Sequence, residues 1–160
     1  MNQKNGFTLI ELMVVIAIIA ILATLAIPTF NKFIAKSKRT EAIMQLHSLY
    51  AAEKIYWAEQ GTYSTQLNGE GAVGWKPEGY HGGGATENFY YTYGFDGGSE
   101  GTAYFTGKLN TPASFLSGSK ADKNGFTAFA VGYINGETKP DIISIDQNNV
   151  ITIIQDALVD

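Results

Sequence analysis

The chain has 160 residues, a net charge of −4 at pH 7 and no cysteine. This length leaves room for one globular domain and an N-terminal appendage, and the lack of cysteine excludes a disulfide framework and thiolate metal or redox sites. The acidic balance gives no general attraction to nucleic acid or to an anionic membrane, so we expect no sequence-specific nucleic-acid binding. Eighteen glycines and 12% aromatic residues indicate a loop-rich domain that contains β-structure.

The N-terminal segment consists of a short polar stretch, residues 1–6, followed by an apolar run. Residues 7–27 form 21 positions with one charge, Glu11. As a helix this run is about 30 Å long, the thickness of a bilayer core. A secretory signal peptide usually has a shorter apolar region that ends in a small-residue cleavage site, and this run fits neither feature. A generic membrane anchor fits the length but leaves Glu11 unexplained, because a charge at the bilayer centre costs about 2.5–3.5 kcal/mol.

The residues from Gly6 to Met13 read GFTLIELM and directly enter the unbroken apolar run. This string resembles the prepilin signature of type IV pilins and the related pseudopilins. The resemblance implies that residues 1–6 are a leader peptide and that a membrane-embedded prepilin peptidase cleaves between Gly6 and Phe7. It also implies that the same enzyme N-methylates the new amine of Phe7. A glycine at the cleavage position has a physical reason, since a residue without a Cβ lets a protease approach the backbone closely.

Glu11 needs a cation if it is buried among apolar groups, and cleavage would create one in the α-amino group of Phe7. Residues four apart are neighbours on a helix, so a pair within one chain is possible. The resemblance implies instead that Glu11 of one subunit faces the Phe7 amine of an adjacent subunit. Such pairing would help to set the axial register during assembly, because an unpaired charge in apolar surroundings is strongly disfavoured.

The charges that flank the apolar run favour the opposite membrane orientation from the one that the resemblance implies. Lys32, Lys36, Lys38 and Arg39 follow the run, whereas the leader offers Lys4 and the N-terminus. The positive-inside rule would keep the lysine-rich side in the cytoplasm, but the resemblance places those four residues outside. The charge distribution therefore argues against the orientation that the resemblance implies.

A helical period continues past Pro28, and no further proline or glycine occurs before Gly61. We therefore predict one helix from about Phe7 to Glu59, bent or locally loosened near Pro28. The resemblance implies that its first part, residues 7–28, is the transmembrane and filament-core segment and that Pro28 takes part in assembly. Its second part, residues 29–60, is amphipathic and should carry the globular domain on its apolar stripe. The stripe is expected to comprise Phe30, Phe33, Ile34, Ile43, Leu46, Tyr50 and Trp57.

The remaining residues, 61–160, form the expected globular domain. Gly61 should end the helix as a C-cap. The predicted fold is α+β, a long bent N-terminal helix packed against a C-terminal antiparallel sheet of three to four strands, and the resemblance implies the same fold. Many pilins close the C-terminal region with a disulfide, so here the last hairpin is expected to be held by strand pairing and core packing alone. Strands are expected within residues 89–95, 101–107, 126–134, 141–146 and 150–154.

No motif for catalysis, a cofactor or a metal stands out, and we expect no enzyme activity. His47 lies near the apolar stripe and is expected to be a satisfied core or rim histidine. Asp122, Asp141 and Asp146 offer oxygen ligands, as in pseudopilins that bind calcium, but no EF-hand spacing occurs and Asp at turns usually serves backbone geometry. The glycine-rich stretch 68–101 has no phosphate-binding context.

The resemblance as a whole implies a structural subunit of a type IV pilus, with identical subunits in a helical homopolymer, the prepilin peptidase and the inner-membrane assembly machinery as partners. The precursor would lie in the inner membrane of a bacterium and the mature subunit in a retractable extracellular filament for twitching motility, adhesion or DNA uptake. The alternative is a pseudopilin or minor pilin of a type II secretion system or a pilus-priming complex. A solitary anchored binding module would not need the Gly6–Phe7 junction.

Overall fold

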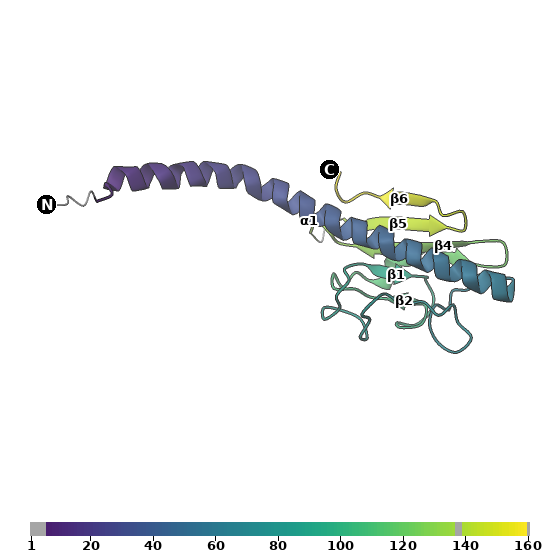
Figure 1. Cartoon of the computed structure of the whole chain (residues 1–160). Helices are drawn as coiled ribbons and strands as arrows, with labels where there is room; N and C mark the ends of the chain where they lie inside the picture. The colour runs from purple at the N-terminus through teal and green to yellow at the C-terminus, as the bar shows by residue number, and fades with distance from the viewer. Residues whose placement is uncertain (1–5, 137–138, 160) are drawn as a thin grey trace. The chain divides into compact units, whose positions relative to one another are not determined.

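The computed structural model describes residues 6–136 and 139–159, and the chain divides into two compact units, Met1–Ile34 and Ala35–Asp160. Helix α1, Leu9–Gln60, runs from the first unit into the second (Figure 1). The second unit also holds a 3-10 helix, η1, and the strands of one sheet. In chain order these elements are β1 (Thr92–Gly94), β2 (Tyr104–Phe105), η1 (Ala113–Leu116), β3 (Lys120–Ala121), β4 (Phe126–Gly132), β5 (Asp141–Asp146) and β6 (Ile151–Gln155).

The single long helix is confirmed, with ends within two residues of those expected. It continues through Pro28, and the bend or loosening at that residue stays a prediction. The helix ends at Gly61, which has a φ of 72° and donates its N–H to the carbonyl oxygen of Trp57 at 2.8 Å. This left-handed conformation suits a residue without a Cβ, so the C-cap is also confirmed.

The α+β fold class is confirmed, but the antiparallel sheet has six strands where three to four were expected. Its order is β2-β1-β4-β5-β6, with β3 on β4 outside this path. Strands β1 and β2 lie within the expected segments 89–95 and 101–107, whereas the two-residue β3 lies in a turn-rich segment whose sequence shows no alternating pattern. The long hairpin of β5 and β6 follows the expected pattern, and Asn149 takes a positive φ of 63° in its turn.

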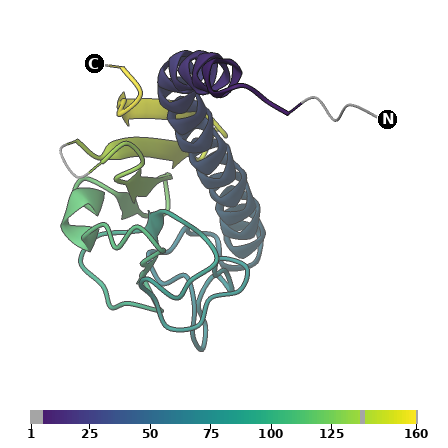
Figure 2. The ribbon, with the colours of Figure 1, turned by 90° about the vertical axis from the view of Figure 1, so that its left-hand side faces the viewer.

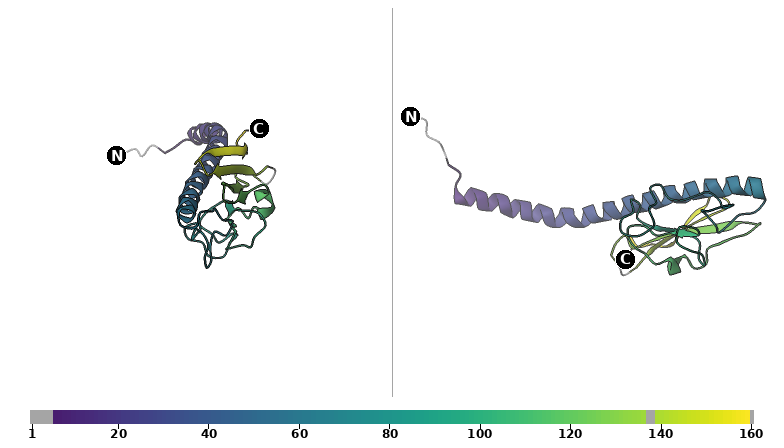
Figure 3. Two further views of the ribbon diagram at one scale, coloured as in Figure 1. Left: turned by 90° about the vertical axis from the view of Figure 1, so that its right-hand side faces the viewer. Right: turned by 90° about the horizontal axis from the view of Figure 1, so that it is seen from below.

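One face of the sheet packs on residues 35–60 of α1, as the views along and across this half of the helix show (Figures 1 and 3). The buried face of the helix is centred on Ala35, Ala42, Leu46, Leu49 and Glu53. Small residues at two of these positions let the helix backbone approach the strands. The expected apolar stripe is therefore only partly right. Leu46 is buried and Ile43 and Tyr50 are partly buried, but Phe30, Phe33 and Trp57 are exposed.

The opposite face of the sheet is covered by η1 and its neighbours (Figure 2). Phe129 and Val131 point to this side and pack with Leu116, whereas Phe126, Ala128 and Ala130 belong to the core on the helix side. Strand β4 is thus buried on both faces, which explains why its sequence is apolar at nearly every position.

Glu53 is a charged residue type at a fully buried position of the helix. Its Oε2 accepts a hydrogen bond from the backbone N–H of Ser64 at 3.2 Å, while its Oε1 has no partner among the described residues. Burial raises the pKa of Glu53 to about 7, and the bond from Ser64 offsets only part of this effect. The carboxyl is therefore most stable in its protonated, neutral form.

The raised pKa of Glu53 predicts a pH dependence of folding. Because the folded state holds the proton more tightly than the unfolded state, the free energy of unfolding should fall as pH rises from about 4.5 to about 7. Glu53→Gln removes the charge and should be more stable than the unchanged chain by roughly 2–3 kcal/mol at pH 8, with little difference at pH 4.

Denaturant unfolding of the detergent-solubilised chain at both pH values, followed by tryptophan fluorescence, measures this difference. Glu59→Gln, at an exposed position one residue before the helix end, is the matched control. Equal pH dependence of the Glu53→Gln variant and the unchanged chain would contradict the assignment.

Candidate processing and assembly segment

The first unit presents an unbroken apolar surface. From Phe7 to Ile27 the large apolar side chains are between 44% and 81% exposed. An 18-residue window of α1 has a mean hydropathy of 2.9 and no buried residue, so in length and composition this helix is able to cross a membrane. Soluble monomers rarely expose apolar patches of more than a few hundred Å², so this surface needs lipid or other protein chains to cover it.

The helix starts with a capping box formed by Thr8 and Glu11. Glu11 Oε2 accepts bonds from the Thr8 N–H at 2.8 Å and from the Thr8 hydroxyl at 2.7 Å, and the Glu11 N–H donates to Thr8 Oγ1 at 3.3 Å. This reciprocal pattern satisfies backbone donors that the first helical turn would otherwise leave unpaired. The acidic side chain also lies where the helix dipole favours negative charge.

The candidate cleavage site lies just before this cap. Gly6, Phe7 and Thr8 are not helical, and Phe7 is 81% exposed. The Gly6–Phe7 peptide is therefore extended chain outside the helix, accessible to another molecule. The structure places Glu11 one turn after it, already bonded to Thr8. Thr8 was not identified as a functional residue, although the spacing Thr-x-x-Glu before an apolar run is a sequence signature of a capping box.

The cap predicts that Thr8 stabilises the first helical turn. Replacing Thr8 with Ala removes the hydroxyl and should destabilise this turn by about 1 kcal/mol, whereas Thr8→Ser keeps the hydroxyl and should have little effect. Amide hydrogen exchange of residues 9–12 in detergent micelles measures the change, with residues 16–20 of the same helix as the internal reference. Unchanged exchange of residues 9–12 in Thr8→Ala would show that the cap contributes nothing.

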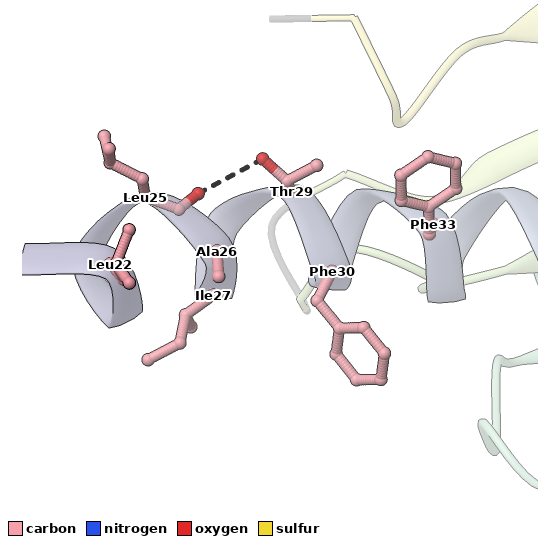
Figure 4. A pocket seen from close by; sticks show the side chains of 7 residues that line it. All are labelled: Leu22, Leu25, Ala26, Ile27, Thr29, Phe30 and Phe33. Atoms are coloured by element: carbon pink, nitrogen blue, oxygen red, sulfur yellow. Dashed lines mark hydrogen bonds between the residues drawn. The ribbon is translucent and has the colours of Figure 1, made fainter. Parts of the chain in front are cut away.

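Pro28 lies within the apolar segment, and the side chains around it form a shallow apolar hollow of about 640 Å³ (Figure 4). Proline has no N–H, so the carbonyl of Thr24 lacks its usual helical donor. Two hydroxyls bond the adjacent backbone: Thr24 Oγ1 donates to Ile21 O at 2.7 Å and Thr29 Oγ1 to Leu25 O at 3.2 Å. The hollow is lined by Leu22, Leu25, Ala26, Ile27, Thr29, Phe30 and Phe33.

Two of the four cations that follow the apolar run have a role in the second unit. The Arg39 guanidinium forms ion pairs with Asp141 and Asp156. The ammonium of Lys38 lies 5.2 Å from the ring centre of Tyr90, a cation–π contact. Burial disfavours the charged form of Arg39, but the bonds to both carboxylates outweigh it and raise the pKa of the guanidinium. These two cations are therefore explained by folding, which weakens their value as a sign of cytoplasmic location.

The remaining candidate ligands serve the backbone or the domain surface. The Nδ1–H of His47 donates to Asn149 Oδ1 at 2.8 Å, which makes His47 a satisfied rim histidine as expected. Asp122 Oδ1 accepts the N–H groups of Asn124 and Gly125, and Asp146 Oδ1 those of Asn148 and Val150. In residues 6–136 and 139–159, no group of three or more His, Asp or Glu is placed to hold a metal ion.

Comparisons with known proteins agree with this N-terminal arrangement. The family model described as the prokaryotic N-terminal methylation motif matches residues 1–27. The type IV major pilin protein PilA of Myxococcus xanthus is 51% identical over 78 residues, which are 48% of this chain and 34% of that protein. A fimbrial protein of Neisseria meningitidis is 37% identical over 70 residues, 44% of this chain and 41% of the relative. The type IV major alpha-pilin of Moraxella bovis is 54% identical over 46 residues, 29% of each chain.

An N-methylation motif on a long apolar helix that continues into an α+β domain defines the class of prepilin-like proteins. The N-terminal part of the chain is similar to type IV pilins and fimbrial proteins, over 29% to 48% of this chain in these three relatives. The match spans between 27% and 41% of the length of these and similar curated relatives.

Proposed function

We propose that this chain is the precursor of a structural subunit of a type IV pilus, which polymerises through its N-terminal helix into an extracellular filament. The observation that supports this most directly is the fully exposed apolar segment with one carboxylate, directly behind a non-helical Gly6–Phe7 peptide. Lipid covers this surface in the precursor, and the helices of identical subunits cover it in the filament. Residues 1–6 are the leader, residues 7–28 the membrane and filament-core segment, residues 29–60 the scaffold helix and residues 61–160 the β-domain.

The names of the relatives favour a major pilin over a pseudopilin or minor pilin, since they include a type IV major pilin and a type IV major alpha-pilin. Twitching motility, adhesion and DNA uptake are the functions proposed for such a retractable filament. The partners would be identical subunits, the prepilin peptidase and the inner-membrane assembly machinery.

Glu11 would have two successive tasks in this proposal. In the single chain its carboxylate is bonded by Thr8, so the charge is not bare at the start of the apolar segment. In the filament it would pair with the Phe7 amine of a neighbouring subunit. A carboxylate has about four acceptor positions, so it is able to keep the cap while it accepts the amine. Axial register would then follow from the position of one charge in each subunit.

The peptidase step is tested first. Gly6→Leu places a branched side chain at the cleaved peptide and should reduce cleavage by about a hundredfold, because a protease loses close backbone approach. Gly6→Ala, which adds one carbon, should be cleaved faster than Gly6→Leu. Mass spectrometry of the N-terminus gives the result for all three chains, and a methylated Phe7 is expected in the unchanged one. An intact Met1 in the mature, unchanged protein would refute the proposed function.

The charge of Glu11 is tested separately from its capping role. Gln is also accepted at the third position of a capping box, so Glu11→Gln keeps the cap and removes the charge, whereas Glu11→Ala removes both. Both variants should insert into the membrane and yield at least about tenfold less sheared fibre, because an unpaired Phe7 amine buried at each subunit contact costs about 3–5 kcal/mol. Wild-type amounts of fibre from Glu11→Gln would show that the carboxylate acts only through the cap.

A further inference from the structure

The last residues of the chain form a segment whose attachment differs from that of the rest of the sheet. We call residues 156–159, which follow β6, the C-terminal strap. Arg39 on α1 donates two hydrogen bonds to Asp141, from Nε at 2.9 Å and from Nη2. It donates two more to Asp156, from Nη1 at 3.2 Å and from Nη2. One guanidinium thus connects the helix, the first residue of β5 and the first residue of the strap. This contradicts the expectation that strand pairing and core packing alone hold the last hairpin.

The two carboxylates on Arg39 lie in different environments. The side chain of Asp141 is fully buried and also accepts the Tyr91 hydroxyl at 2.7 Å and the Ala157 N–H at 3.0 Å. The side chain of Asp156 is 32% exposed, and among the described residues its one further bond comes from the Leu158 N–H at 2.8 Å. Water and salt therefore reach the pair of Asp156 with Arg39, whereas the pair of Asp141 with Arg39 is shielded.

Apolar burial contributes little to the strap. Ala157 is buried and Leu158 is partly buried against the core, while Val159 is 61% exposed. Besides the buried bond from the Ala157 N–H to Asp141, the bonds are long: Asn135 Nδ2 donates to Ala157 O at 3.3 Å in a partly buried position, and Lys139 Nζ to Val159 O at 3.3 Å at the surface. The ion pair is accordingly a large part of what holds these residues.

Strand β6, which leads into the strap, lies at the edge of the sheet, and in the part of the chain that the structure describes it pairs with β5 alone. Its Ile153 and Ile154 are 43% and 53% exposed, and a register shift interrupts its pairing opposite Ile142 and Ile143. A strand with little burial and an irregular ladder opens at a lower free energy than the central strands. The end of β6 next to the strap is thus the weak point of the domain.

We propose that the C-terminal strap is an electrostatic latch, in which the ion pair of Asp156 with Arg39 keeps β6 paired with β5. When this ion pair breaks, β6 and the strap detach while α1 and β1 to β5 stay folded. The latch weakens in high salt, because the pair is open to solvent. It also weakens in acid. The bond from Arg39 lowers the pKa of Asp156, so the stabilisation is present above the usual carboxyl range and is lost as pH falls through the lowered pKa. The charged groups that face Asp156 are Arg39, Asp141 and Lys139, and Tyr91 faces Asp141.

Hydrogen exchange of the full chain in detergent micelles tests the latch. Asp156→Asn should speed exchange of the β6 and strap amides by about tenfold and leave those of β4 unchanged. In the unchanged chain, raising the salt from 0.01 to 1 M shortens the screening length from about 30 Å to about 3 Å and should speed β6 exchange in the same way. The variant should show little further response to salt. Asp96→Asn, an exposed carboxylate in the turn after β1, is the control with the same change of net charge.

Three results would overturn the proposal. The first is equal β6 exchange in Asp156→Asn and the unchanged chain. The second is faster exchange in β4 by the same factor as in β6, which would mean that Asp156 contributes to global stability only. The third is a salt response of β6 that is as large in Asp156→Asn as in the unchanged chain.

Discussion

The arrangement of this chain depends on one constraint, which is that the apolar surface of residues 7–27 cannot stay in water. Its side chains are uncharged except for Glu11, and most of their area is exposed in the single chain. A helix satisfies its own backbone groups, so this segment is stable in lipid or among other apolar helices without any change of backbone structure. The same segment therefore fits two environments in succession. Under the proposed function, membrane storage and polymerisation would need no refolding step.

The second half of the helix solves a different problem, because it must hold a small sheet without covalent cross-links. Ala35 and Ala42 allow close approach, and Leu46 and Leu49 fill the space between helix and strands. The polar connections are placed at the two ends of this contact, with Arg39 near its start and Glu53 near its end. Without cysteines, this domain uses the buried carboxylate of Asp141, which accepts several hydrogen bonds and stabilises the domain strongly only while all of its partners are present.

The sequence predicted the large features because each has a local signal. The apolar run, the helical period up to Gly61 and the β5–β6 hairpin extend over enough residues for their pattern to be unambiguous. The short strands β1 and β2 lie within segments where strands were expected, but β3 was not expected, because its two residues show no period and are defined only by the partner strand. The Arg39 ion pairs were out of reach for a similar reason: Arg39 and Asp141 are about a hundred positions apart in the chain, and no local pattern connects them. The burial of Glu53 likewise has no local signal, because it depends on tertiary packing, which includes the bond from the Ser64 N–H. Thr8, in contrast, was missed despite a readable capping signature.

The capping box at Thr8 and Glu11 has a consequence for the energetics of processing. In the uncut chain the backbone nitrogen of Phe7 belongs to a neutral amide. The carboxylate of Glu11 therefore faces only the partial positive charge of the helix start. In the proposed mature chain a full positive charge would appear two residues before the first helical residue, at the end of the helix that already repels cations. The single negative charge of Glu11 would then face both the partial positive charge of the helix start and the new ammonium, and it cannot neutralise both. Cleavage would thus convert an electrostatically balanced helix end into one with a surplus of positive charge. That surplus gives the cut chain, and not the precursor, a reason to seek a second carboxylate on another molecule.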